Sequence, residues 1–560
     1  MVAIVQIAQK RERKNIYMRQ FQPALFRCLK QYSKDQFVKD LVAGVIVAII
    51  ALPLSIALAL ASGVGPEQGL YTAIVAGFII SFLGGSNVQI AGPTAAFASI
   101  VAGIVAKNGM DGLAVATILA GIILVIMGLL RMGSMIKYIP YTITTGFTAG
   151  IAVTIVIGQL KDFLGLTFQG TPVEAMEKLA EVFRCFDTFN PAALGVGALS
   201  LAILIFLPKF LPKIPPSLIA VLAGAAVVKL ADLPVNTIGD LYTISSALPT
   251  PHLPEVSFSL VQTVLPDAFT IAILAAVESL LSAVVADEMI DERHNSNTEL
   301  VAQGVGNAFS ALFGGIPATG AIARTAANIK NGGRTPVAGM IHAVVLLLIL
   351  VLLMPYAALI PMPTIAAILF MVAYNMSGWR SCVKLLKTSP KSDCAVFLLT
   401  FTLTVVFDLV VAIVVGVTVA CLLFMKRMAD EASIQEWDYV EITNDPEGRL
   451  RPVPKNVMVY EVTGPLFFGM ADKFPSISDL DPEKRIIIVR MRSVPAVDTT
   501  AMNSIRKLWE ECRRHDVYTI FSHVNDQPMS VFRKSGFLEE VGEEFFQPNI
   551  DAALEMAKKL

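Results

Sequence analysis

Long apolar segments fill positions 41 to 428 of this 560-residue chain, and the pattern changes after them. A membrane-crossing helix needs about 20 mostly apolar residues, because the hydrocarbon core of a bilayer is about 30 Å thick. The pattern predicts fourteen segments, two of which are too short to cross. We expect them at about 40–63, 69–83, a half-helix opening at Gly92–Pro93, 112–130, 141–160, 192–208, 216–233, 264–286, 297–314, a half-helix from Thr319, 337–355, 360–376, 392–407 and 409–425.

Two short stretches occupy corresponding places in the two halves of this region. They read Gly92-Pro93-Thr94-Ala95-Ala96 and Pro317-Ala318-Thr319-Gly320-Ala321-Ile322-Ala323-Arg324, and each follows a Gly-Gly pair. Paired hydrophobic segments interrupted by Gly and Pro indicate a transporter site made by facing half-helices. We therefore interpret the two stretches as the walls of an anion site.

The tail, 429–560, has the charge content of an ordinary soluble domain. Apolar runs at 457–462, 485–490 and 517–521 predict strands, and helical spacing predicts helices at 500–514 and 549–560. Alternating strands and helices indicate a small α/β domain. The expected organisation is a cytoplasmic N-terminal region (1–38), a transmembrane domain (39–428, with halves 39–233 and 262–428) and this tail.

Loop charges set the expected orientation. The first forty residues carry nine Lys and Arg against three Asp and Glu, and the connection from 231 to 262 has no Lys or Arg. By the positive-inside rule the N-terminus is cytoplasmic. An even number of spans then returns the tail to the cytoplasm. The location we expect is the inner membrane of a bacterium.

Composition agrees with a membrane protein and narrows the chemistry. The chain is 55% hydrophobic and 16% charged, with a mean hydropathy of +0.65 and a net charge of −1. Its six cysteines are scattered without the spacing of a disulfide framework or zinc site. The sequence has no phosphate-binding loop that would support ATP-driven transport. It also has no nucleophile paired with a base that would indicate an enzyme. We expect no cofactor, no metal and no nucleic-acid partner.

Glu278 is the only ionisable residue between Ala268 and Ala286. An acid inside a membrane helix is a functional hypothesis by default, and removal from water favours the neutral form of a carboxyl group. Glu278 is thus suited to bind and release a proton, with Ser282 one helical turn further on the same face. The alternative is that Glu278 is a structural partner for a nearby arginine.

Arg324 is the expected cationic group of the site. Two helix N-termini offer unpaired N–H groups and partial positive charge, and the guanidinium adds a full charge. Thr94 and Thr319, the latter followed by Gly320, are candidate hydroxyl donors to the anion. Both threonines could instead be plain helix caps, and Arg324 could serve only to neutralise Glu278.

These motifs resemble the sulfate permease (SulP) family of anion transporters over essentially the whole chain. The residues that carry the resemblance are Ala51–Ala57, Gly69–Tyr71, Ala91–Ala96, Gly304–Asn307, Phe313–Pro317, Ala321–Ala326 and Asn328. Leu280, Ala286 and Phe407–Asp408 add a likeness to bacterial members known as aerobic C4-dicarboxylate transporters.

The resemblance implies two inverted seven-segment repeats arranged as a core and a gate, with the core moving like an elevator. It implies a homodimer and an anion held between the two half-helices. Carried over position by position, the anion would contact Pro93, Thr94, Ala95, Ile322, Ala323 and Arg324, and Leu54 and Leu58 would line the pocket.

One departure from the family bears on coupling. Sodium-coupled bicarbonate members have an aspartate at the position of Glu278, a threonine near Ser282 and no arginine at the position of Arg324. An adjacent sodium ion would be repelled by the guanidinium at a cost of a few kcal/mol. Proton coupling through Glu278 is therefore favoured over sodium coupling.

The tail resembles a STAS domain. Asp498-Thr499-Thr500-Ala501 matches the loop where anti-sigma factor antagonists carry a phosphorylated serine, so Thr499 is a candidate regulatory site. A capping loop that packs against a soluble protein partner is the other interpretation.

The leading functional hypothesis is secondary active transport of a small anion, a C4-dicarboxylate or an inorganic oxyanion such as sulfate or bicarbonate, together with protons. The alternatives are an uncoupled exchanger or channel, and a sensor that signals through the tail.

Overall fold

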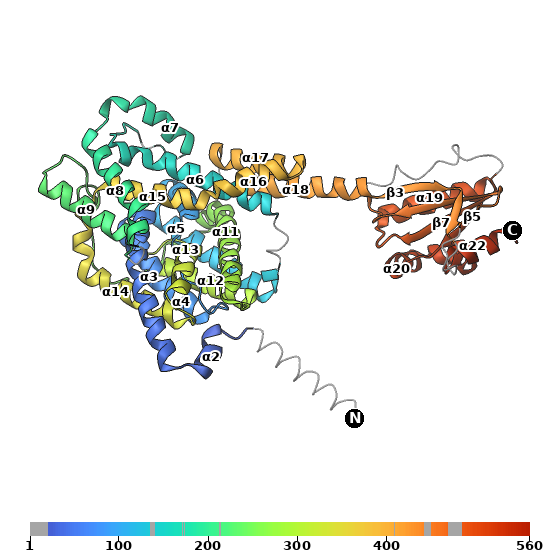
Figure 1. Ribbon diagram of the computed structural model, residues 1–560, viewed down its shortest axis with the longest axis horizontal. Coiled ribbons are helices and arrows are strands. Elements are labelled where there is room, and N and C mark those ends of the chain that lie inside the picture. The colour runs from blue at the N-terminus through green and yellow to red at the C-terminus, as the bar shows by residue number, and fades with distance from the viewer. Residues whose placement is uncertain are drawn as a thin grey trace. The chain divides into compact units, whose positions relative to one another are not determined.

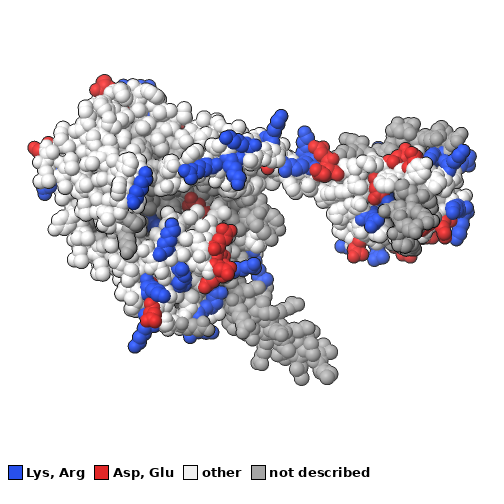
Figure 2. All heavy atoms as spheres, viewed as in Figure 1, with Lys and Arg blue, Asp and Glu red and all other residues white. Residues whose placement is uncertain are grey.

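The computed structural model describes residues 21–134, 140–170, 172, 174–211, 214–407, 409–441, 450–468 and 484–560. The chain divides into two compact units, Met1–Val417 and Thr418–Leu560. The division falls inside helix α18 (Leu409–Glu431), earlier than the boundary expected at residue 429. Figure 2 shows large uncharged areas on the first unit, whereas residues of both charges are scattered over the second.

The first unit is helical and follows the predicted order of segments (Figure 1). Its first half contains α3 (Lys34–Ala61), α4 (Pro66–Leu83), η2 (Ala95–Phe97) continued by α5 (Ala98–Leu129), α6 (Tyr141–Leu164), α8 (Pro191–Phe210) and α9 (Pro216–Leu230). Its second half contains α11 (Phe258–Ile290), α12 (Ser296–Leu312), α13 (Ile322–Lys330), α14 (Val337–Ala357), α15 (Met362–Ser377), α17 (Lys391–Val406) and the first part of α18.

Helix α5 is two segments joined at a break. Gly109 leaves helical conformation there, with φ 68° and ψ −170°. The part before the break is the predicted half-helix and the part after it the predicted span. Within the described residues this gives seven segments in each half, as the apolar pattern predicts. Nine helices of the described chain are long and apolar enough to cross a membrane.

Short helices that the apolar pattern did not predict lie before the first span and between later spans. They are α2 (Ala24–Cys28), η1 (Leu29–Gln31), α7 (Ala175–Arg184), η4 (Phe186–Thr188), α10 (Ile238–Leu241) and α16 (Trp379–Thr388). Helices α7 and α16 are strongly amphipathic. Their polar faces made the segments resemble loops in a search for apolar runs.

The helices pack as two groups. In the first, α5 packs against α11 and α12, α4 against α12 and α14, and α3 against α14. In the second, α6 packs against α15 and α17, and α8 against α9 and α15. Both half-helices belong to the first group, because α5 and α13 each pack against α11. This grouping agrees with the core and gate that the resemblance implies.

A buried carboxylate ties the second half to the segment that leads into the first half-helix. Glu299 on α12 is 1% exposed, and its Oε2 accepts hydrogen bonds from the backbone N–H groups of Gly85 (2.9 Å) and Ser86 (3.2 Å). Its Oε1 accepts from Gln303 Nε2 (3.0 Å) and Ser279 Oγ (3.4 Å). Four donors therefore stabilise this buried charge, and they fix the position of residues 85 and 86.

The second unit is built on a five-stranded sheet with the order β3-β6-β7-β8-β9. Strand β3 (Ser433–Trp437) is antiparallel to β6 (Val457–Thr463), and β7 (Ile486–Ser493), β8 (Tyr518–Ser522) and β9 (Phe546–Gln547) continue the sheet in parallel. A separate hairpin pairs β4 (Tyr439–Glu441) with β5 (Leu450–Pro452). The helices are α19 (Thr499–Arg514), α20 (Asp526–Lys534), α21 (Phe537–Val541), η7 (Glu543–Phe545) and α22 (Ile550–Ala557).

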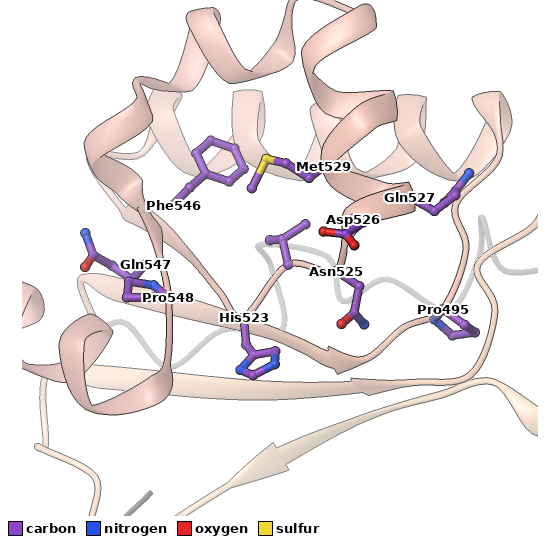
Figure 3. Close-up of a pocket in the computed structure, with 10 residues that line it drawn as sticks. Pro495, His523, Asn525, Asp526, Gln527, Met529, Phe546, Gln547 and Pro548 are labelled. Atoms are coloured by element: carbon purple, nitrogen blue, oxygen red, sulfur yellow. The ribbon is translucent and has the colours of Figure 1, made fainter.

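A cavity of about 640 Å³ lies at the carboxyl ends of the parallel strands (Figure 3). Pro495 lines it from the segment after β7, His523 and Asn525 from the segment after β8, and Phe546 and Gln547 from β9. This edge of an open α/β sheet is where ligands commonly bind.

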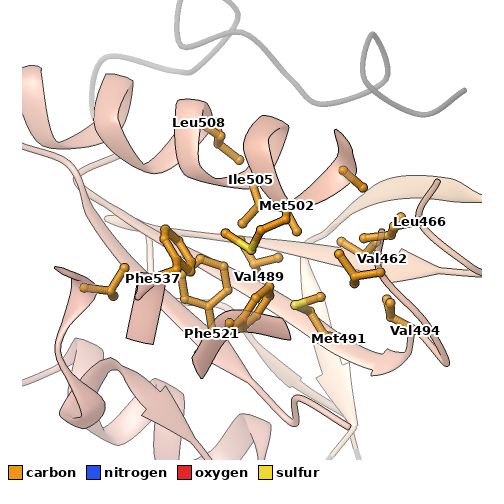
Figure 4. Close-up of a cluster of buried hydrophobic side chains, with 14 of the residues drawn as sticks. Val462, Leu466, Val489, Met491, Val494, Met502, Ile505, Leu508, Phe521 and Phe537 are labelled. Carbon is orange, nitrogen blue, oxygen red and sulfur yellow. The ribbon is translucent and has the colours of Figure 1, made fainter. Parts of the chain in front are cut away.

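Two apolar layers cover the sheet of the second unit. Phe521, Phe537 and Met502 belong to the layer that α19, α20 and α21 complete (Figure 4). Ile488 and Leu554 belong to the layer on the opposite face, which α22 completes. The predicted strands 457–462, 485–490 and 517–521 and the predicted helices 500–514 and 549–560 are confirmed to within a few residues.

We predict that Glu299→Gln destabilises the first unit. A neutral amide turns either its NH₂ group or a weaker acceptor toward the N–H donors of Gly85 and Ser86, and hydrogen bonds to a charged group contribute about 1.5–3 kcal/mol. The apparent melting temperature of purified protein in detergent should fall by several degrees. Glu288→Gln, which changes an exposed acid on α11, should leave it unchanged. Equal melting of the two variants would show that Glu299 does not anchor this segment.

Candidate anion site

The two motif stretches pair with each other through their backbones. Ala91–Gly92 forms β1 and Thr319–Gly320 forms β2, and the two strands are antiparallel, with Ala91 opposite Gly320 and Gly92 opposite Thr319. Beyond the pair, the Ala321 N–H donates to the carbonyl of Ile90 (2.9 Å). The predicted meeting of the two stretches is therefore present in the structure.

Each strand leads directly into a helix start. Thr94 is the N-cap residue of η2, which continues into α5, and Ala321 is the N-cap residue of α13. Neither N-cap side chain accepts a hydrogen bond from the helix it precedes. The first N–H groups of both helices thus lack side-chain caps beside the paired strands, and such groups attract anions.

Arg324 lies in the first turn of α13 and is 1% exposed. Its Nη2 donates to the carbonyl of Pro93 (3.2 Å) and to Ser55 Oγ (3.3 Å). Its Nε and Nη1 have no hydrogen-bond partner among the described residues. A buried guanidinium with two unused donor nitrogens is costly unless another acceptor satisfies them. An oxyanion is such an acceptor.

The space around the guanidinium depends on Gly92. A Cβ atom at this position would lie 2.3 Å from Arg324 Nη1. Any larger residue at position 92 would therefore displace the guanidinium from its place beside the paired strands.

Glu278 lies on α11 beside the start of the first half-helix. Thr94 Oγ1 donates to Glu278 Oε2 at 2.9 Å. Within the described residues no ion pair joins Glu278 to Arg324, so the hypothesis that the arginine merely neutralises this acid has no support from the contacts. Pro93 and Thr94 are adjacent in the chain. One accepts from Arg324 and the other donates to Glu278.

The other threonine has a structural contact. Thr319 is fully buried, and its Oγ1 donates to the carbonyl of Ala275 (3.1 Å). The cap interpretation of Thr319 is wrong, because the residue lies in β2 and Ala321 precedes α13. Gly320 lies against Gln89, whose Nε2 a Cβ atom would meet at 1.5 Å. Gln89 in turn donates to Ser279 Oγ (2.8 Å) and fixes β1 to α11.

The other predicted site residues differ in their exposure. Ile322 and Ala323 are exposed at the start of α13, whereas Pro93 and Ala95 are buried. Leu58 is 2% exposed, and Leu54 packs against the cluster of Leu204, Ala220, Ala367 and Ile368. Ser282 is buried, and its Oγ has no partner among the described residues.

Sequence reasoning missed three buried polar residues of the first unit. Ser55 hydrogen-bonds the guanidinium, and Gln89 supports the strand pair. His342 is fully buried on α14 and has no partner for either ring nitrogen among the described residues. A search for single polar residues inside apolar runs would have found Ser55 and His342.

Two features of the second unit could take a ligand or a partner. Thr499 is exposed at the first position of α19. The preceding Asp498 caps this helix by accepting from the Ala501 N–H (2.8 Å) and also accepts from the Phe468 N–H (3.0 Å). The other feature is the cavity of Figure 3. In the described part of the chain, no group of three or more His, Cys, Asp and Glu side chains could hold a metal ion.

Comparison with known proteins finds a matching family for each of the two units. Residues 37–400 match the model of the "Sulfate permease family", and residues 450–553 match that of the "STAS domain". The chain is 39% identical over 522 residues to "Putative sulfate transporter YvdB" of Bacillus subtilis, covering 92% of this chain and 97% of that protein. It is 32% identical over 505 residues to "Bicarbonate transporter BicA" of Picosynechococcus sp., covering 86% of this chain and 88% of that protein.

Solved structures are similar to this chain in the same way. The transmembrane domain of a cyanobacterial bicarbonate transporter, BicA, superimposes with a TM-score of 0.61 at 30% identity, covering 70% of this chain and 98% of that chain. A structure of SLC26A9 matches with a TM-score of 0.87 at 19% identity, covering 98% of this chain and 94% of that chain, and shows the fold alone. The protein is therefore a member of the sulfate permease family of membrane transporters and carries a C-terminal STAS domain.

Proposed function

We propose that this protein carries a small oxyanion across a bacterial inner membrane together with a proton. The anion would bind between the starts of η2 and α13, where Arg324 has two unused donor nitrogens. Glu278 would carry the proton. The observation that supports this proposal best is the pair Pro93–Thr94, which contacts Arg324 on one side and Glu278 on the other.

Coupling follows from this shared contact. When Glu278 is ionised, it accepts a hydrogen bond from the Thr94 hydroxyl and holds the loop before η2. When Glu278 is protonated, one negative charge leaves the site, and an incoming anion meets less repulsion. Proton and anion binding then favour each other, and the reciprocity of linkage requires that each raises the affinity for the other.

Sulfate and bicarbonate are the substrates we favour, because the relatives described above carry these anions in their names. The site chemistry accommodates both, since two helix starts and one guanidinium can neutralise one or two negative charges. The C4-dicarboxylate hypothesis rests on resemblance alone and is tested in the same assay. The guanidinium of Arg324 would repel a neighbouring sodium ion, so we favour protons as the coupling ion.

We further propose that transport moves the helix group containing both half-helices against the group around α6, α8 and α15, as in an elevator. Leu54 contacts residues of the second group and would slide along it. The protein would act as a homodimer with both termini in the cytoplasm. The STAS domain, through Thr499 or the cavity beside β7 and β8, would bind a soluble regulatory protein. Transport would involve no chemical conversion of the substrate.

The proton dependence is tested with Glu278→Gln. Purified protein in proteoliposomes should accumulate labelled sulfate or bicarbonate under an inward proton gradient but not under a sodium gradient, and labelled succinate is assayed in parallel. A neutral glutamine cannot release a proton, so the variant should lose gradient-driven accumulation while still binding the anion. Glu278→Asp should retain part of the coupling. Undiminished accumulation by Glu278→Gln would refute the assigned role.

The anion site is tested with Arg324→Ala. Removing one partner of a buried charge interaction costs about 2–5 kcal/mol, so the dissociation constant measured by equilibrium binding should rise by more than about 30-fold. Arg324→Lys keeps the charge but loses the planar fork and should give an intermediate value. An unchanged affinity in folded Arg324→Ala protein would place the anion elsewhere.

The bridge that Pro93–Thr94 forms between Arg324 and Glu278 is tested with a matched pair of substitutions at Thr94. Thr94→Ser keeps the hydroxyl that contacts Glu278, whereas Thr94→Val keeps the shape without it. Losing one hydrogen bond to a charged group costs about 1.5–3 kcal/mol. Thr94→Val should therefore shift the pH at which anion affinity changes, and Thr94→Ser should not. Identical pH profiles for the two variants would exclude this bridge.

A further inference from the structure

Helix α16 presents an apolar strip on its exposed side. Trp379, Val383 and Leu386 are 47%, 41% and 43% exposed. With 3.6 residues per turn, these three side chains lie within about 60° of one another around the helix axis. A surface helix of a water-soluble protein normally carries polar residues at such positions. We therefore expect this strip to contact an apolar environment.

A basic edge lies beside the apolar strip. Arg380, Lys384 and Lys387 are all exposed. They lie about 100° around the helix axis from the apolar strip. The guanidinium of Arg380 lies over the ring of Trp379, 5.5 Å from its centre. The helix contains no acidic residue. The third side is buried, because Leu385 is 4% exposed and α16 packs against α6.

The chain turns between α15 and α16. Gly378 adopts φ 53° and ψ 33°, the left-handed conformation that ends helices and favours glycine, so α16 does not extend the apolar helix α15. At the turn, Trp379 Nε1 donates to the hydroxyl of Tyr374 (3.3 Å), and both aromatic residues are exposed. Exposed Trp and Tyr at the end of an apolar helix are typical of the boundary between lipid and water.

We propose that α16 is an interfacial helix that binds anionic lipid. Its apolar strip enters the boundary between head groups and acyl chains, and Arg380, Lys384 and Lys387 contact the phosphate groups of phosphatidylglycerol-type lipids in the same leaflet. Figure 2 shows Lys and Arg side chains gathered on the surface where Figure 1 places α16 and α17.

Charge and apolarity together favour lipid as the occupant. A free phosphate ion would satisfy the three cations but would leave Trp379, Val383 and Leu386 in water. An anionic lipid covers both features at once, and amphipathic helices with a basic face bind such surfaces through buried apolar area and electrostatic attraction. The elements on either side of α16, α15 and α17, are segments of the membrane unit, which brings the helix to the lipid.

The test measures quenching of Trp379 by brominated lipids. The full chain is reconstituted in phosphatidylcholine vesicles containing equal small fractions of either brominated phosphatidylglycerol or brominated phosphatidylcholine. The chain has three tryptophans, so the contribution of Trp379 is the difference between the parent and Trp379→Phe. We expect bromine near the head group to quench Trp379 more than bromine near the chain end, and brominated phosphatidylglycerol to quench several-fold more than brominated phosphatidylcholine.

The basic edge is tested with the triple variant Arg380→Gln/Lys384→Gln/Lys387→Gln. Because each cation near an anionic surface contributes about fivefold to the attraction, this variant should lose the preference for phosphatidylglycerol while quenching by phosphatidylcholine remains. The matched control, Lys534→Gln/Lys558→Gln/Lys559→Gln, removes three exposed charges from the second unit and should keep the preference.

Two outcomes would overturn the proposal. Absence of quenching by either lipid would mean that water, a second copy or a soluble protein covers the strip. Equal quenching by the two lipids in the parent would show that the basic edge does not select anionic head groups.

Discussion

The backbone pairing of Ala91–Gly92 with Thr319–Gly320 is the constraint on which the candidate site depends. Two residues from each half of the chain form this short ladder, and both following helices start immediately beyond it. The ladder therefore holds the first N–H groups of both helices close to the same point in the membrane unit. Surrounding contacts secure it, since Gln89 joins β1 to α11, Thr319 joins β2 to the Ala275 carbonyl, and Glu299 anchors the approach to β1. Gly92 leaves the space that Arg324 occupies beside the ladder.

This geometry keeps the side chains of Arg324 and Glu278 apart but links both to the same short segment of the chain. Arg324 and Glu278 make no ion pair among the described residues, and each contacts a different member of the pair Pro93–Thr94. A direct ion pair would stabilise the empty site and use the guanidinium that an anion needs. The observed arrangement leaves two guanidinium nitrogens unused, so their desolvation is compensated only when an acceptor arrives. In the mechanism we propose, anion binding and proton binding influence one another through this two-residue segment.

Much of this could be predicted from the sequence because apolar runs and interrupted motifs are local signals. The fourteen segments, the meeting of the two motif stretches and the strands of the STAS domain belong to this class. The contact of Thr319 with Ala275, the role of Ser55 and the buried His342 could not be predicted, because each depends on which side chains a distant helix brings near. Helices α7 and α16 were missed because amphipathic surface helices lack long apolar runs, and β3 and β9 because edge strands are short and partly exposed.

The most direct test of the account is proton uptake on anion binding. Sulfate or bicarbonate is added to purified protein in weakly buffered solution, and the pH change is compared with the amount of anion bound. Bicarbonate carries its own protons, so sulfate gives the cleaner reading. The account predicts that the protein takes up protons as it binds anion and that both saturate together. Saturating anion binding without any proton uptake, across the pH range in which the protein is folded, would contradict it.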